Sequence, residues 1–285
     1  MNTPFSPQKI VIAGAGTMGS GIAQVFALGG SEVILYDLNP GILDIATKEI
    51  SKSLNKAVER GKIDSERANK ANNRITFTND INKLKANLIL EAIIEVPEVK
   101  MDLFGKLEEI NDDHTVFASN TSSIPITQLA AGLKNPGNFL GIHFFNPAPI
   151  MKLVEVVSGI ATKPDLAVSV YNWLQQIGKI PVMAKDSPGF IVNRVARQFY
   201  TESLKSVEEN AASIEQVDRL MEATGFKMGP FKLMDLIGVD TNHKVTTTMF
   251  EQFFQEPRFR PSRLQKQYVD AGYTGKKNGK GFYEY

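Results

Sequence analysis

The chain has 285 residues, which is enough for one large domain or two domains of ordinary size. Lys and Arg total 32 and Asp and Glu total 31, so the formal net charge is +1, and a nucleic-acid-binding protein, which needs a basic surface, is not expected. There are no cysteines and three histidines, which excludes disulfides, thiolate catalysis and thiolate metal sites and argues against a histidine metal site.

The N-terminal sequence has no basic stretch followed by a long apolar run, and no run of 18 apolar residues occurs along the chain. We therefore expect neither a secretory signal nor a membrane span, and a cytoplasmic protein is the default expectation.

Residues 9–13 predict a short strand, a glycine-rich turn follows, and residues 20–29 predict a helix. With a second strand at 32–36, this is a βαβ unit, which favours a parallel sheet.

Short runs rich in apolar and β-branched residues predict six further strands. They are residues 75–78, 88–94, 115–119, 139–144, 153–157 and 180–184. Helical stretches such as 97–110 and 164–177 separate most of them. This alternation predicts an α/β domain over residues 1–186, with a doubly wound, mostly parallel Rossmann sheet.

The pattern changes after Pro188, where a period of 3.6 residues dominates and little strand signal remains. Residues 191–210 and 214–224 are the clearest examples. We therefore expect an all-helical second domain over residues 187–285.

A glycine-rich turn and an acidic residue predict a dinucleotide site. Gly14 permits a tight turn, Gly16 lets the backbone approach a pyrophosphate, and Gly19 lets helix and strand pack closely. Asp37 ends the second strand, where a carboxylate binds the adenosine ribose hydroxyls and repels a 2′-phosphate, so NAD is favoured over NADP. The alternative is a glycine turn that only permits packing.

His143 and Glu155 are candidates for acid–base chemistry. They lie on two consecutive predicted strands, and the turn around residues 146–149 would bring their side chains near each other. An imidazole paired with a carboxylate has a fixed tautomer and raised basicity, and it can accept an alcohol proton. The alternative, left open by spacing alone, is a structural histidine and an unrelated glutamate.

Two polar clusters also stand out. Ser119–Ser123 follows a predicted strand and could hydrogen-bond a substrate oxygen, but spacing alone favours a cap for a helix over 126–133. Lys48, Lys52, Lys56 and Arg60 recur every four residues and could hold phosphates, but spacing alone favours a solvated helix face.

Seven blocks, in this order along the chain, resemble the (S)-3-hydroxyacyl-CoA dehydrogenase family, in particular its short bacterial members that act on 3-hydroxybutanoyl-CoA. They are residues 14–19 (GAGTMG), 118–123 (ASNTSS), 141–149 (GIHFFNPAP), 152–157 (KLVEVV), 186–194 (DSPGFIVNR), 228–230 (MGP) and 279–283 (GKGFY). The resemblance covers essentially the whole chain.

The resemblance implies a role for individual residues. His143 would be the general acid and base, oriented by Glu155, while Ser122 and Asn193 would hydrogen-bond the substrate near its reacting oxygen. Coenzyme A phosphates would meet Lys52 and Lys56. Glu95 and Lys100 would lie near the nicotinamide ribose, and Asn146 near the nicotinamide or substrate. The full set expected at the cofactor is Gly14, Gly16, Thr17, Met18, Gly19, Asp37, Glu95, Lys100, Asn120, Ser122 and Asn146.

We therefore expect an NAD-dependent oxidoreductase that interconverts (S)-3-hydroxyacyl-CoA and 3-ketoacyl-CoA thioesters, with short chains preferred. The resemblance also implies a homodimer formed through the helical C-terminal domain. The charge balance and the lack of long apolar runs predict no nucleic-acid or membrane partner. Three alternatives stay open: a related dehydrogenase of a free hydroxy acid or sugar acid, a non-catalytic NAD-binding or structural protein, and a partner module whose purpose is the C-terminal helical dimer.

Overall fold

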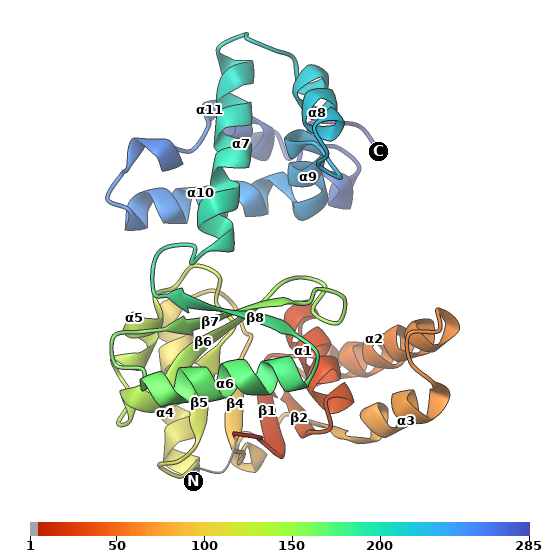
Figure 1. The fold of residues 1–285 in the computed structure, drawn as a ribbon, viewed down its shortest axis with the longest axis vertical. Helices are drawn as coiled ribbons and strands as arrows, with labels where there is room; N and C mark the ends of the chain where they lie inside the picture. Colours follow the sequence, from red (N-terminus) through yellow and green to blue (C-terminus); the bar gives the residue numbers. More distant parts are fainter. Residues whose placement is uncertain (1–4) are drawn as a thin grey trace. The chain divides into compact units, whose positions relative to one another are not determined.

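The computed structural model describes residues 5–285 of the protein. The chain divides into two compact units, Met1–Ser187 and Pro188–Tyr285 (Figure 1). The first unit contains the sheet and the helices that cover it, and the second unit is built from helices.

Within residues 5–285, eight strands form one sheet in the order β3-β2-β1-β4-β5-β6-β7-β8. All neighbouring pairs are parallel except β6 and β7, which are antiparallel. The order reverses between β1 and β4, so the predicted doubly wound, mostly parallel α/β sheet is confirmed. The strands are β1 (Lys9–Ala13), β2 (Glu32–Tyr36), β3 (Ile75–Thr78), β4 (Leu88–Glu91), β5 (Val116–Ser119), β6 (Phe139–Phe144), β7 (Leu153–Ser158) and β8 (Ile180–Lys185).

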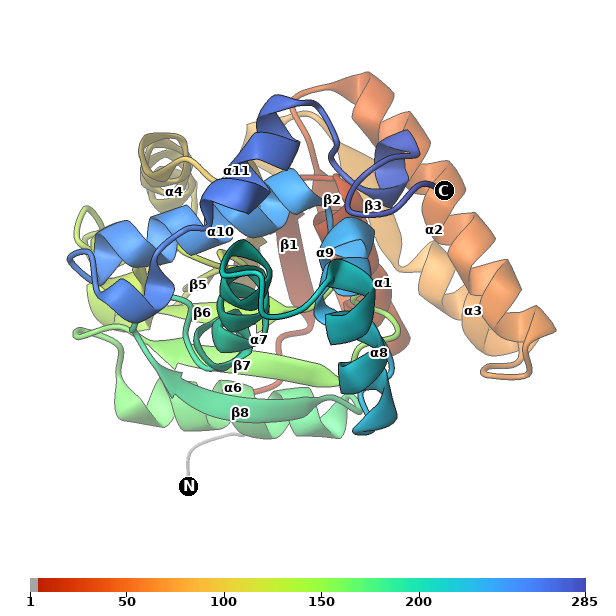
Figure 2. The ribbon, with the colours of Figure 1, turned by 90° about the horizontal axis from the view of Figure 1, so that it is seen from above.

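Helices cover both faces of this sheet (Figure 2). On one face, Phe26 of α1 packs against Trp173 of α6 in a core shared with alternate strand residues such as Ile12. On the other face, Phe104 of α4 packs edge-on against Phe117 and Phe139. The helices of this unit are α1 (Thr17–Leu28), α2 (Pro40–Glu59), α3 (Ser65–Asn73), α4 (Pro97–Ile110), α5 (Ile126–Ala130) and α6 (Pro164–Gln176), with 3-10 turns at Ile81–Lys83 and Pro136–Asn138.

The second unit has its own apolar core, as the helical periodicity of its sequence predicts. Seven buried side chains form this core: Tyr200, Leu204, Val217, Phe231, Met234, Val239 and Phe282. Its helices are α7 (Val192–Glu208), α8 (Ile214–Ala223), α9 (Pro230–Ile237), α10 (Val239–Gln252) and α11 (Arg263–Asp270), with 3-10 turns at Pro257–Phe259 and Lys276–Asn278.

Several element ends differ from those expected from sequence. The strand expected over 88–94 ends at Glu91, because the Glu91 side chain accepts the N–H of Ile93 and turns the chain out of the sheet. The helix expected from residue 20 begins at Thr17, directly after the glycine turn. The helix expected over 126–133 is the single short segment Ile126–Ala130.

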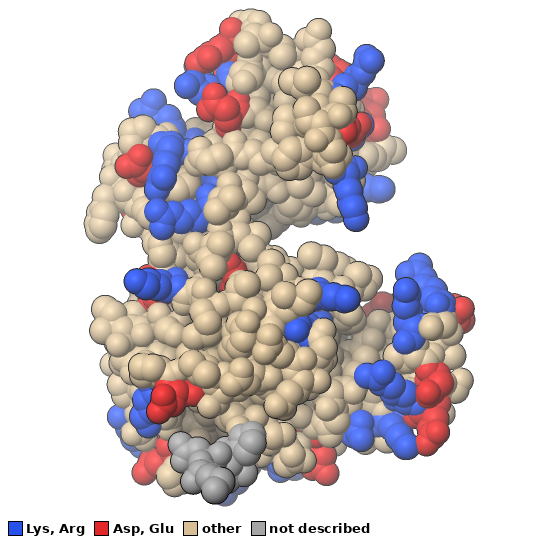
Figure 3. Space-filling model, in the orientation of Figure 1, with Lys and Arg blue, Asp and Glu red and all other residues tan. Residues whose placement is uncertain are grey.

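The surface mixes charges of both signs. On the face drawn in Figure 3, basic and acidic side chains lie interspersed over both units, including the end of the first unit where α2 and α3 lie. In the part of the chain that the structure describes, none of the helices combines the length and the apolar character needed to cross a bilayer.

Candidate active site

Polar side chains end three neighbouring parallel strands. Glu91 is the last residue of β4, Ser119 is the last residue of β5, and His143 is the second-last residue of β6. Successive residues of a strand point to opposite faces, and the residue before each of these three belongs to the α1 and α6 core. Those preceding residues are Leu90, Ala118 and Ile142. The polar side chains therefore share the α4 face at the carboxyl edge of the sheet, where ligands bind in such folds.

His143 is held on both ring nitrogens. The antiparallel register pairs it directly with Glu155 of β7, and Nδ1 lies 2.7 Å from the Glu155 Oε2. Nε2 lies 2.9 Å from the Ser122 Oγ. Because a carboxylate only accepts hydrogen bonds, Nδ1 carries the proton, which leaves Nε2 as the basic nitrogen beside Ser122. His143 and Glu155 are both buried, at 3% and 0% exposure.

Glu95 fixes the loop that carries Ser122. Its Oε1 accepts the backbone N–H of Ser122 at 3.0 Å and that of Ser123 at 3.2 Å. It also accepts the hydroxyls of Thr121 and Ser123. One carboxylate oxygen therefore gathers three consecutive loop residues, which sets the Ser122 side chain against His143.

Lys100 lies between two carboxylates. Its Nζ is 2.5 Å from the Glu91 Oε1 and 3.1 Å from the Glu95 Oε2, and its side chain is only 1% exposed. Burial raises the pKa of Glu91, although Lys100 and Ser119 oppose that shift. Burial also acts to raise the pKa of Glu95, but the charge of Lys100 and the loop hydrogen bonds outweigh it, so the pKa of Glu95 is lowered.

The helix-cap explanation of the Ser119–Ser123 cluster is wrong. The residue before α5 is Pro125, which supplies no side-chain cap. Instead, the Asp186 carboxylate accepts the N–H groups of Ile126 at 2.9 Å and Thr127 at 2.7 Å. Asp186 follows β8, so the acceptor for this helix start comes from the far end of the unit, and the hydroxyls of residues 119–123 have other partners.

The glycine turn has the geometry a dinucleotide needs. Gly14 has φ +106°, and a Cβ on it would lie 2.6 Å from the Ala92 carbonyl oxygen. A Cβ on Gly19 would overlap the Gly14 carbonyl oxygen. A Cβ on Gly16 would meet no other heavy atom of the described residues within 4 Å, so the backbone there faces open space. Since α1 starts at Thr17 without a side-chain cap, its first N–H groups suit a phosphate.

Asp37 lies beside this turn. Its Oδ2 accepts the N–H of Ala15 at 2.9 Å, and its Oδ1 accepts the N–H of Asn39 at 3.0 Å. The carboxylate is half-buried and directly follows β2. The residues present therefore fit NAD: an open glycine backbone, an uncapped helix start, and an acid at the end of the second strand.

The other residues expected at the cofactor lie in different surroundings. Thr17 is exposed, whereas Met18 is half-buried and packs against the core. The Asn120 side-chain oxygen accepts the N–H of Phe144 at 2.8 Å, which ties its loop to the strand of His143. Asn146 is exposed and lines a cavity of about 430 Å³ between α1, α2 and the loop of residues 145–152.

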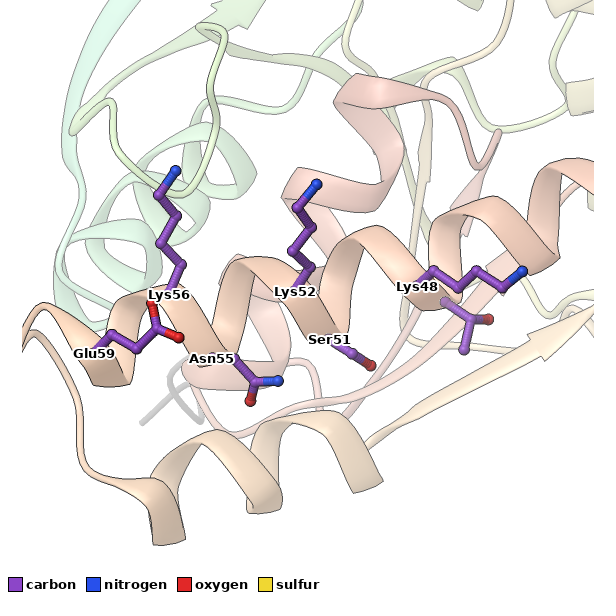
Figure 4. A pocket seen from close by; sticks show the side chains of 7 residues that line it. Lys48, Ser51, Lys52, Asn55, Lys56 and Glu59 are labelled. Atoms are coloured by element: carbon purple, nitrogen blue, oxygen red, sulfur yellow. The ribbon is translucent and has the colours of Figure 1, made fainter.

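The basic residues expected at coenzyme A lie on α2. Lys52 and Lys56 extend from this helix in one direction, while Ser51 and Asn55 lie on another side of it (Figure 4). These side chains line a hollow of about 740 Å³ along α2. Both lysines are exposed, and Lys52 lies 3.8 Å from Glu49. Such a pair is weak in water, so the lysine is available to another anion.

Asn193 belongs to the second unit, whereas the residues described above belong to the first. It is the second residue of α7 and is half-buried. Sequence reasoning missed Glu91, which contacts Lys100 and Ser119. It included Thr121 in the Ser119–Ser123 cluster but not its hydrogen bond to Glu95. The signal for Glu91 was a carboxylate inside an apolar strand run, which is costly unless it is paired.

A sheet that reverses order at β1 and β4, with this turn and acid, defines an NAD-binding dehydrogenase domain. The family model described as 3-hydroxyacyl-CoA dehydrogenase, NAD binding domain, matches residues 9–187, and that described as its C-terminal domain matches residues 189–285. The chain belongs to the 3-hydroxyacyl-CoA dehydrogenase family.

Individual relatives support this assignment. The 3-hydroxyadipyl-CoA dehydrogenase of Escherichia coli is 45% identical over 98% of this chain, which spans 59% of that protein's length. The probable 3-hydroxybutyryl-CoA dehydrogenase of Bacillus subtilis is 39% identical, covering 98% of this chain and 97% of that protein. A solved (S)-3-hydroxybutyryl-CoA dehydrogenase from Ralstonia eutropha has a TM-score of 0.94 at 35% identity, covering 98% of this chain and 99% of its own.

Proposed function

We propose that this protein interconverts (S)-3-hydroxyacyl-CoA and 3-ketoacyl-CoA thioesters, with a short acyl chain such as 3-hydroxybutanoyl. The observation that carries the proposal is the His143 ring, held between the Glu155 carboxylate and the Ser122 hydroxyl. The family and the names of relatives that match this chain along nearly their whole length support the substrate class.

His143 acts as general base toward the substrate hydroxyl and as general acid in the reverse direction. Its Nε2 is the acceptor nitrogen of the ring because Glu155 holds the proton on Nδ1. When Nε2 takes up the hydroxyl proton, the ring becomes an imidazolium, and the adjacent Glu155 carboxylate stabilises that charge. A positioned acid or base of this kind contributes roughly 100- to 10,000-fold in rate.

Ser122 and Asn193 donate hydrogen bonds to the reacting oxygen. Ser122 is already placed at the basic nitrogen of His143. Donors aimed at an oxygen where negative charge develops commonly contribute about 3 kcal/mol each. The role of Asn193 is assigned on the family pattern around residues 186–194 alone.

NAD supplies the hydride acceptor when it is bound. Gly14, Gly16 and Gly19 shape the turn that receives its pyrophosphate, and Asp37 holds the adenosine ribose. The remaining contacts are assigned to Thr17, Met18, Glu95, Lys100, Asn120, Ser122 and Asn146.

The coenzyme A part of the substrate binds along α2. The cavity of about 430 Å³ is walled by α2 residues including Glu49 and Ser53. Lys52 lies between these two residues in the sequence and Lys56 lies one turn beyond Ser53, and we assign phosphate contacts to the two ammonium groups. A thioester with a long polar arm can therefore reach from the cavity to the lysines.

The test is NADH oxidation after acetoacetyl-CoA is added to the purified protein. We expect rapid oxidation with NADH and little with NADPH, because the Asp37 carboxylate repels a 2′-phosphate. Free acetoacetate and 3-ketoadipyl-CoA are run alongside. Equal rates with free acetoacetate would favour a free hydroxy-acid dehydrogenase, and faster rates with the adipyl thioester would move the preferred substrate to a dicarboxylic chain.

Binding of NADH without oxidation of either thioester would instead indicate a non-catalytic NAD-binding protein. A fluorescence titration of NADH, carried out on the same sample, separates that outcome from a protein that has lost its cofactor site.

The protein further forms a homodimer through the second unit. Several large apolar side chains of this unit are exposed, and an interface with a second chain would bury them. They include Val195, Leu220, Phe226, Leu236 and Phe254. Sedimentation analysis is expected to give twice the mass of one chain, and a monomer at micromolar concentration would contradict the proposal.

A further inference from the structure

Glu91 is a fully buried carboxylate outside the set expected to touch substrate or cofactor. It is 0% exposed and ends β4, directly opposite Ser119 of β5. Its Oε1 accepts the N–H of Ile93 and the ammonium of Lys100, and its Oε2 accepts the hydroxyl of Ser119 at 2.6 Å. All of these partners donate, so both carboxylate oxygens of Glu91 serve as acceptors.

Two chains of contacts lead from Glu91 to the loop of Ser122. Along the first, Glu91 holds Lys100, and Lys100 holds the Oε2 of Glu95, whose Oε1 accepts the N–H of Ser122. Along the second, Glu91 accepts the hydroxyl of Ser119, and the Ser119 Oγ accepts the N–H of Thr121 at 3.1 Å. Thr121 in turn donates to Glu95, so the two chains close on the same carboxylate.

The charges in this cluster have a definite order. Lys100 is buried between two carboxylates. Its single positive charge can balance only one of their two negative charges. Glu91 has no exposure, whereas the Glu95 side chain is 30% exposed. Glu91 therefore fixes Lys100 from the protein interior, and the fixed ammonium sets the position of the more exposed Glu95.

We propose that Glu91 is a positioning residue that holds the Ser122 hydroxyl against Nε2 of His143 through Lys100, Ser119 and Glu95. This inference rests on the proposed function for its kinetic readout. Displacement of a catalytic group by about 1 Å can reduce the rate by about 100-fold. A buried residue that fixes the position of Ser122 can therefore affect turnover without touching the substrate.

The first test is a double-mutant cycle between Glu91 and Ser122. We expect Glu91→Gln to lower kcat by about 10-fold or more in the wild-type background. In the Ser122→Ala background, where there is no hydroxyl to position, we expect the same change to cost less than about 3-fold. Equal losses in both backgrounds would show that Glu91 acts only on general stability, and would overturn the inference.

The second test needs no turnover. The chain has three histidines, so the ring signals of His143 can be followed by NMR in the absence of cofactor. In Glu91→Gln, the Nε2 signal is expected to move toward its position in Ser122→Ala. An unchanged His143 signal would overturn the inference even if the protein proved not to be a dehydrogenase, whereas absent wild-type turnover alone contradicts only the proposed function.

Two further variants address a general effect of altering a buried carboxylate and a failure of Glu91→Gln to fold. Asp235→Asn alters an equally buried carboxylate in the second unit and is expected to leave the His143 signal unchanged. Ser119→Ala breaks the second chain of contacts and keeps the Glu91 carboxylate. If Glu91→Gln fails to fold, Ser119→Ala is expected to show the same coupling to Ser122, and a purely additive loss would again contradict the inference.

Discussion

Buried carboxylates occur in both units, but their partners differ. In the first unit, Glu91 and Glu155 face the side chains of Lys100 and His143. In the second unit, Asp235 accepts the backbone N–H groups of Phe282 and Tyr283 and the hydroxyl of Tyr285. Asp218 likewise accepts the N–H groups of Phe231 and Lys232 and the hydroxyl of Tyr283.

The difference in partners distinguishes carboxylates that serve catalysis from carboxylates that stabilise the fold. A carboxylate satisfied mainly by backbone N–H groups fixes the path of the chain, and here it fixes the last residues against α8 and α9. A carboxylate paired with a titratable or cationic side chain controls the position and charge of that side chain. Burial alone does not distinguish the two, since all four are at most 1% exposed.

The strongest test of this distinction is His143→Gln. We expect turnover to fall by roughly 100-fold or more because the general acid and base is lost. The affinity for NADH, measured by fluorescence titration, is expected to change little. A folded variant with wild-type turnover would remove the catalytic role assigned to the first unit.

Glu155→Gln is expected to have the next largest effect. The neutral amide can still hydrogen-bond Nδ1, but it cannot stabilise the imidazolium, so kcat should fall by roughly 10-fold or more. Steady-state kinetics with saturating NADH measure it. A variant that changes KM for the thioester with kcat unchanged would mean that Glu155 serves binding instead.

Asp235→Asn is expected to affect stability and not chemistry. Replacing one acceptor oxygen with a donor leaves a buried N–H group unsatisfied, at a cost of about 1–3 kcal/mol. Chemical denaturation should report that loss, while kcat per folded molecule stays at the wild-type value. A fall in kcat comparable to that of Glu155→Gln would contradict a purely structural role for the buried carboxylates of the second unit.

Asp37→Ala tests a half-buried carboxylate that combines both kinds of role. It holds the backbone of Ala15 and is expected to bind the ribose. We expect the ratio of kcat/KM for NADH over NADPH to fall by about 10-fold, since a repulsive charge and a hydrogen-bond acceptor are lost. A wild-type protein that already prefers NADPH would contradict this role.

Lys179 extends the comparison to a buried cation. Its Nζ donates to the carbonyl oxygens of Ala148 and Met151, and burial lowers its pKa to about 8. Above pH 8 the unfolded chain, with the ordinary pKa of 10.5, binds more protons than the folded one. The free energy of unfolding should therefore rise between pH 8 and 10.5 relative to Lys179→Met. A pH-independent difference between the two proteins would contradict the lowered pKa.

Local signals predicted much of the fold and part of the site. Strand runs, the glycine turn and Asp37 lie within short stretches. His143 and Glu155, which are antiparallel neighbours, are only 12 residues apart. The anchors of the Ser122 loop are not local, since Glu95 and Ser122 are 27 residues apart. Asp186 caps α5 from 60 residues away, so no pattern near residue 126 reveals it.

The strand prediction also concealed Glu91. Extending β4 to residue 94 made this glutamate an interior strand residue, whereas the structure places it at the strand end. The reason is physical: the side chain itself accepts the N–H of Ile93 and ends the strand. Secondary-structure propensity carries no information about a bond of that kind.

The antiparallel pairing of β6 and β7 also determines where the chain length can change: in the connection between the two strands, but not inside either strand. The ladder pairs His143 with Glu155, and the connecting residues 145–152 lie outside both strands. An insertion or deletion in that connection can leave the pair in register and still change the wall of the neighbouring cavity. A single residue gained or lost inside either strand would turn one of the two side chains to the opposite face.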